Sequence, residues 1–122
     1  SALSFAQPAV RRWFKKTFEA PTPAQSKGWR SIAAGESSLL LAPTGSGKTL
    51  AAFLFALDQL MFAPPPEGKQ VRVLYISPLK ALGVDVERNL RGPIIGVQAE
   101  AEREGEACRL PVVGVRTGDT PQ

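Results

Sequence analysis

The chain has 122 residues, of which 43% are hydrophobic and 21% charged, and this composition is typical of one globular domain. It excludes an intrinsically disordered segment, and a single cysteine, Cys108, excludes an intrachain disulfide framework. The apolar runs are too short to cross a bilayer, and the first residues lack the apolar stretch of a signal peptide. We therefore expect a soluble, cytoplasmic protein.

The net charge of +4 is unevenly distributed along a chain that has no histidine. Lysines and arginines gather in residues 1–30, and glutamates gather in residues 100–106. A basic balance permits binding to nucleic acid or another polyanion. Solvated helix faces explain each cluster equally well, so charge alone does not identify a partner.

The first third of the chain predicts two helices. Pro8 suits the first turn of a helix that runs to Phe18, in which the large apolar residues are spaced to share one side. The sequence "PTPAQ" at 21–25 breaks that helix. A second helix follows it, with Gly35 at its natural end.

The remainder alternates between strand and helix patterns. The three apolar runs that predict strands lie at 37–42, 71–77 and 111–116. The helices that we expect between them cover about 47–62, 77–90 and 94–104. Alternation of this kind predicts an α/β fold with a mostly parallel sheet flanked by helices. We divide the chain into a helical segment, 1–35, and an α/β unit, 36–122.

The last residues suggest that this domain is truncated. After the third predicted strand, Thr120 and Pro121 have the pattern of a helix N-cap and first helical residue. The sequence ends there. We therefore expect the chain to be part of a larger protein.

A glycine-rich sequence, "APTGSGKT" at 42–49, follows the first predicted strand and opens the next helix. It fits the phosphate-loop spacing G-x-x-x-x-G-K-[ST], with alanine at the first position. The residues that would bind the phosphates are Thr44, Gly45, Ser46, Gly47, Lys48 and Thr49. Lys48 would reach the β- and γ-phosphates, and the Thr49 hydroxyl would complete the coordination of Mg²⁺. The alternative is a glycine-rich turn beside a surface lysine.

Hydrolysis in this class needs an acidic residue at the end of another strand, where it positions Mg²⁺ and water. Asp58, Asp85 and Glu87 fall in predicted helices, and Asp119 falls in a turn. The sequence therefore predicts nucleotide binding by a chain that lacks the catalytic acid.

Three flanking segments carry a family resemblance. They are "FEAPTPAQ" at 18–25, "SPLKAL" at 77–82 and "VRTGDT" at 115–120. Together with the phosphate loop they resemble the first motor domain of a superfamily-two helicase, and within it the large helicase-related (Lhr) family. The resemblance covers nearly the whole chain. It implies a partial RecA-like fold and an enzyme that couples ATP hydrolysis to movement along single-stranded DNA or RNA, with the rest of the helicase chain as partner.

The resemblance also implies roles for single residues. Gln25 matches the glutamine that reads the adenine edge, a pairing that an amide can make bidentately. The positions that match nucleic-acid contacts are Ser77, Pro78, Lys80, Arg116, Thr117 and Gly118. A solvent-exposed glutamine, an ordinary capped helix and a plain turn are the respective alternatives.

An aromatic residue that stacks on the base is less evident. Phe18 matches a packing aromatic, and Phe5, Trp13 and Phe14 are candidates for stacking, with core packing expected for each. Two other functions also stay open. A P-loop ATPase or kinase would not depend on nucleic acid, and a non-catalytic module would bind nucleotide only.

Overall fold

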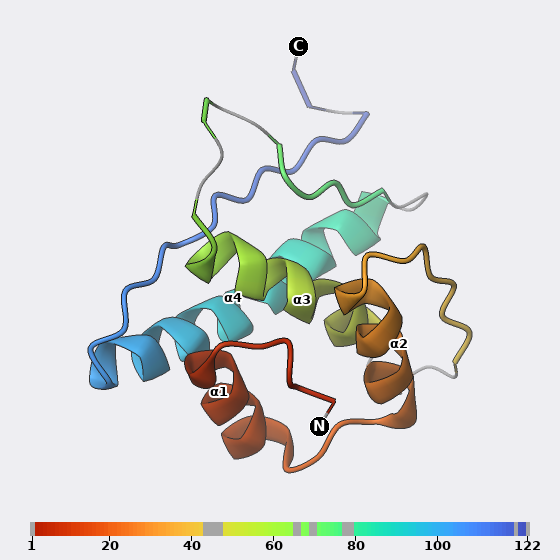
Figure 1. The fold of residues 1–122 in the computed structure, drawn as a ribbon. Helices are drawn as coiled ribbons and strands as arrows, with labels where there is room; N and C mark the ends of the chain where they lie inside the picture. The colour runs from red at the N-terminus through yellow and green to blue at the C-terminus, as the bar shows by residue number, and fades with distance from the viewer. Residues whose placement is uncertain are drawn as a thin grey trace.

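The computed structural model describes residues 2–42, 48–64, 67–68, 71–76, 80–118 and 120–121. Its helices are α1 (Pro8–Phe18), α2 (Pro23–Ala33), α3 (Lys48–Phe62) and α4 (Lys80–Arg103). They form two packed pairs, α1 against α4 and α2 against α3 (Figure 1). α3 and α4 both begin toward the same side of that view, and the chain's C-terminal segment runs above them.

The first two helices lie where the sequence predicts them. Pro8 and Pro23 occupy the first helical turns, where a missing N–H costs nothing. α2 ends beside Gly35, whose φ of 80° lies in the left-handed region that glycine adopts without strain. Local sequence signals therefore suffice to define both helices.

The hydrophobic core lies where the four helices and the N-terminal segment meet. Its largest fully buried apolar side chains are Trp29, Phe14, Leu54, Met61, Val10 and Val97. Phe14 of α1 and Trp29 of α2 pack edge to face, with ring centroids 5.5 Å apart. Trp13 and Phe14 are core residues, as the alternative to base stacking predicts.

The two helices predicted over 77–90 and 94–104 are in fact one continuous helix, α4, with Pro93 inside it. An internal proline removes one backbone hydrogen bond and usually interrupts a helix. Gly92 has no Cβ to clash with the proline ring, which eases this restriction. The second half of α4 packs against α1. The Trp13 ring lies so close to Gly96 that a Cβ at this position would clash with it.

The three predicted strands are not formed in the part of the chain that the structure describes. Segments 37–42, 71–76 and 111–116 have no regular secondary structure. Leu41 is 86% exposed and Val112 is 100% exposed. A strand is stabilised by backbone partners on neighbouring strands and by covered faces, and these segments lack both here. The described residues therefore do not confirm the predicted sheet, and apolar side chains of these segments are left exposed.

The basic and acidic clusters of the sequence meet between α1 and α4. The Glu100 carboxylate lies 2.6 Å from Lys16 Nζ and 3.4 Å from Arg12 Nε. Arg12 also pairs with Glu106 at 2.9 Å, and Arg103 approaches Glu100 at 3.4 Å. These basic residues of α1 therefore stabilise the fold, whereas Lys15 and Lys27 are exposed.

Candidate nucleotide-binding site

Lys48 and Thr49 are the first two residues of α3, and both are exposed to solvent. No acidic residue lies in the first turn of this helix. The N–H groups and partial positive charge of a helix N-terminus attract anions, and no carboxylate of the first turn competes for them. This end of α3 thus has the donors and the charge that a phosphate group requires. The other loop residues of the sequence prediction, Thr44, Gly45, Ser46 and Gly47, lie outside the described residues.

α3 is held firmly by its apolar side. Ala51, Leu54, Leu57 and Met61 are buried at helical spacing, and α3 packs along α2. Lys48 and Thr49, which precede these apolar residues, are left on the outside. The sequence dictates this arrangement because polar residues precede the apolar repeat.

Gln25 sits at the start of α2 and is only 4% exposed. Its Oε1 accepts a hydrogen bond from the Thr22 backbone N–H at 3.0 Å, and its own N–H donates to Thr22 Oγ1 at 3.2 Å. This reciprocal pattern is a capping box. The glutamine is therefore not the solvent-exposed residue of the alternative interpretation.

Thr22 is a residue that the sequence reasoning missed. The signal was present, because the spacing T-x-x-Q at 22–25 is the sequence signature of a capping box. The backbone N–H of Thr22 orients the Gln25 side chain, so any reading of a base by Gln25 depends on that backbone contact.

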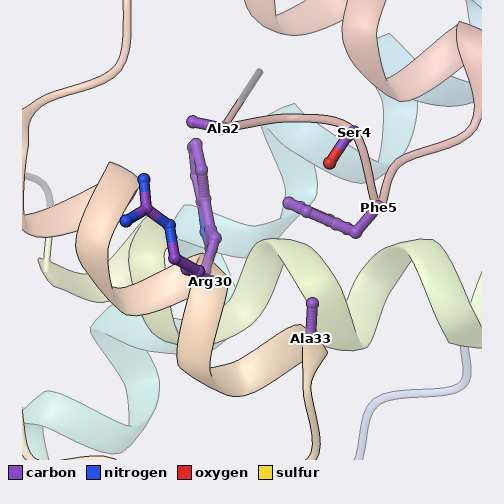
Figure 2. Close-up of a pocket in the computed structure, with 6 residues that line it drawn as sticks. Ala2, Ser4, Phe5, Arg30 and Ala33 are labelled. Carbon is purple, nitrogen blue, oxygen red and sulfur yellow. The ribbon is translucent and has the colours of Figure 1, made fainter.

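A cavity of about 380 Å³ lies between the N-terminal segment and α2 (Figure 2). Ser4 and Phe5 approach it from the N-terminal segment, and Arg30 and Ala33 come from α2. Phe5 is the stacking candidate that is only half-buried, but its ring packs against Trp29 at 5.7 Å. Trp29 also lines this cavity, and its buried indole N–H has no hydrogen-bond partner among the residues that the structure describes.

The candidate nucleic-acid contacts are only partly described. Ser77 and Pro78 lie outside the described residues, and Lys80 is the first residue of α4. Arg116 and Gly118 are exposed on the C-terminal segment. Thr117 lies in a closed turn, in which its N–H donates to Thr120 Oγ1 at 2.7 Å and its carbonyl accepts from the Thr120 N–H at 3.0 Å.

The pairing of α2 with α3 brings the helix of Gln25 against the helix of Lys48 and Thr49. No cluster of three or more metal-binding side chains occurs among the residues with described positions. A Mg²⁺ ion would therefore need ligands beyond these side chains, such as phosphate oxygens beside the Thr49 hydroxyl. None of the described helices is long and apolar enough to span a membrane.

Comparison with known proteins identifies the class. The family model for the DEAD/DEAH box helicases matches residues 22–109, a stretch that includes the phosphate loop, α2, α3 and α4. The chain belongs to the DEAD/DEAH box helicase family.

Several similar proteins are Lhr helicases. The chain is 55% identical over 112 residues to the Lhr helicase/probable uracil glycosylase of Mycolicibacterium smegmatis, covering 92% of this chain and 7% of that protein. It is 49% identical to the Lhr helicase/uracil glycosylase of Escherichia coli, covering 93% of this chain and 8% of that protein. Identity to the ATP-dependent helicase Lhr-Core of Methanocaldococcus jannaschii is 39%, over 91% of this chain and 13% of the archaeal protein.

A solved structure agrees in backbone course. The structure of Mycobacterium smegmatis helicase Lhr bound to ssDNA and AMP-PNP superposes with a TM-score of 0.86 and 50% sequence identity. The match covers 99% of this chain and 15% of that chain. The resemblance to the N-terminal part of an Lhr-type RecA-like motor domain is thus confirmed. The chain spans less than a tenth of the length of the two bacterial relatives.

Proposed function

We propose that this chain is the ATP-binding part, with nucleic-acid contacts, of an ATP-dependent helicase that moves along single-stranded DNA or RNA. The observation that carries the proposal is the start of α3, where Lys48 and Thr49 are exposed beside a helix N-terminus that has no acidic residue. Similarity to Lhr helicases over more than 90% of the chain supports it.

ATP and Mg²⁺ are the cofactors of the proposal. Lys48 would hold the β- and γ-phosphates as a point charge, and the Thr49 hydroxyl would face Mg²⁺. Gln25 would read the adenine edge from its fixed position in the capping box. Mg²⁺ would neutralise charge on the phosphates, and cleavage would require the acidic residue that this chain lacks.

The exposed apolar segments fit the same proposal. We expect 37–42, 71–76 and 111–116 to become strands of a mostly parallel sheet when the rest of the helicase chain supplies their neighbours. A TM-score of 0.86 to a solved helicase, over 99% of this chain, supports this expectation. Burial of residues such as Leu41 and Val112 would stabilise the completed sheet.

The proposed nucleic-acid contacts are made by residues near the start of α4 and in the final turn. Ser77, Pro78 and Lys80 would bind backbone phosphates at a helix N-terminus, and Arg116, Thr117 and Gly118 would add a second contact. The solved relative is described as bound to ssDNA, which supports this assignment.

Substitution of Lys48 tests the proposal. In the full-length protein that carries this chain, Lys48→Ala should lower the ATP hydrolysis rate at least about a hundredfold. The substitution removes the positive charge that would stabilise the transferred phosphate. Lys27→Ala is the matched control, since Lys27 is an exposed lysine of α2 outside the loop. Unchanged hydrolysis by Lys48→Ala would contradict the role of the loop.

The alternative function is a P-loop ATPase or kinase without nucleic acid. Measurement of the hydrolysis rate with and without a single strand separates the two. Stimulation by the strand supports the helicase, and a rate that does not respond supports the alternative.

A further inference from the structure

Asp58 is a buried acid that the proposed nucleotide chemistry does not use. It lies in α3, about three turns beyond Lys48, and is 2% exposed. Its Oδ1 accepts a hydrogen bond from the backbone N–H of Gln7 at 2.8 Å. Burial raises the pKa of Asp58, while the Gln7 hydrogen bond and the charge of Arg11 oppose that shift. Because burial of a carboxylate is unfavourable, we expect Asp58 to make an interaction that compensates for it.

That partner is the start of α1. Gln7 is the N-cap of α1, and its side chain makes no capping hydrogen bond. The first turn of α1 also contains no acidic residue. A negative charge near a helix N-terminus is stabilising. Asp58 therefore supplies from α3 the capping group that α1 lacks in its own sequence.

The residues just before α1 form what we call the N-terminal strap, residues 2–7. Leu3 and Ala6 of the strap are buried in the core. The Phe5 ring contacts Trp29 of α2, at 5.7 Å, and Phe55 of α3, at 5.6 Å. The strap consequently touches both helices that carry the candidate nucleotide-binding residues.

Helical spacing places the residues that the strap contacts on the same sides of α2 and α3 as Gln25 and Asp58. Trp29 follows Gln25 by one turn and so lies on the same side of α2. Phe55 precedes Asp58 by three residues, so the strap meets both on one side of α3. A shift of the strap would thus move the helix of Gln25 relative to the helix of Lys48 and Thr49.

We infer that Asp58 is a positioning residue, which holds the N-terminal strap so that Gln25 and the Lys48–Thr49 pair lie at the spacing that ATP requires. The inference rests on the proposed function, because it concerns the same nucleotide. Asp58 does not contact the nucleotide itself. Asp58 therefore affects only the affinity for ligands whose base and phosphates are bound at the same time.

The test compares a probe with a base and a probe without one. In the full-length protein, Asp58→Leu removes the acceptor, and dissociation constants are measured for ATP and for inorganic tripolyphosphate. We expect ATP to bind about tenfold more weakly and tripolyphosphate to bind as before, since only ATP spans both helices. Asp58→Asn, which keeps an oxygen for the Gln7 N–H, should recover most of the loss.

Two further variants make the result decisive. Phe5→Ala loosens the strap without changing a buried charge. It should raise the dissociation constant of ATP relative to that of tripolyphosphate even where Asp58→Leu fails to fold. Lys15→Ala, an exposed change on α1, should leave both constants unchanged. A parallel loss for both probes, or no loss for either, would overturn the inference. If Lys48→Ala still binds ATP normally, the proposed function fails instead.

Discussion

Gln25 combines a structural role with a proposed functional one. Its amide oxygen accepts the Thr22 N–H in the capping box, and the residue is buried at the start of α2. An amide group can make several hydrogen bonds, so capping and reading an adenine edge are compatible. The two roles can be separated by mutating each member of the box.

Gln25→Ala should weaken the use of ATP more than the use of GTP, because only adenine offers the matching donor and acceptor edge. It should also lower the free energy of unfolding by about 1 kcal/mol through loss of the cap. Thr22→Ala should cost a similar amount of stability and leave the ATP-to-GTP ratio closer to that of the unchanged protein. Michaelis constants for the two nucleotides and thermal melts of the full-length protein check both expectations. An equal loss for ATP and GTP in Gln25→Ala would show that the residue is structural only.

At the scale of elements, the contact between α1 and α4 depends on a buried carboxylate. The hydrogen bond from Lys16 lowers the pKa of Glu100, and the charge of Arg103 and the hydrogen bond from Arg12 act in the same direction. A pKa lowered by folding stabilises the folded state above the ordinary value of 4.5, and this stabilisation is lost as pH falls through the folded value.

Glu100→Gln should therefore destabilise the chain at neutral pH and reduce its sensitivity to acid. Denaturant titrations at a series of pH values should show the two stability curves converging below pH 4.5. Glu102→Gln is the matched control, because Glu102 is an exposed glutamate on the same helix. Parallel curves for Glu100→Gln and the unchanged chain would mean that the carboxylate does not carry this pH dependence.

α1, α2 and α3 lie close to their predicted positions because proline, capping residues and apolar spacing act locally. α4 was divided wrongly because Pro93 and Gly96 weaken a helix in isolation. In the folded chain, the absence of a Cβ on Gly96 lets the Trp13 ring pack closely against α4. Residues 83 sequence positions apart make that contact, and a local pattern contains no information about it.

At the scale of the whole molecule, apolar segments without strand partners are the main feature. Val112, Leu41 and Leu39 are each more than 80% exposed, on segments that were predicted as strands. Large exposed apolar surface and unpaired backbone favour association. The same residues should behave differently in the chain by itself and in the longer protein.

Val112→Lys tests this difference. In the 122-residue chain it should leave the melting temperature nearly unchanged and reduce self-association, since Val112 is fully exposed. In the full-length protein it should lower the melting temperature of the motor domain, because a lysine would be buried without a partner in the completed sheet. Light scattering and calorimetry of both proteins provide the measurements. The same response in both would mean that 111–116 does not become a covered strand.

The sequence by itself determined the positions of the first three helices, the phosphate-loop spacing that ends at Lys48 and Thr49, and the family. These follow from local backbone preferences and from motifs whose chemistry needs fixed residue types at fixed distances along the chain. Only the tertiary structure decided that Gln25 is buried in a cap, that Glu100 gathers cations from α1, and that Asp58 holds the N-terminal strap. Those features depend on burial and on contacts between segments far apart in sequence, which change the energy of a charged or polar group without leaving a local pattern.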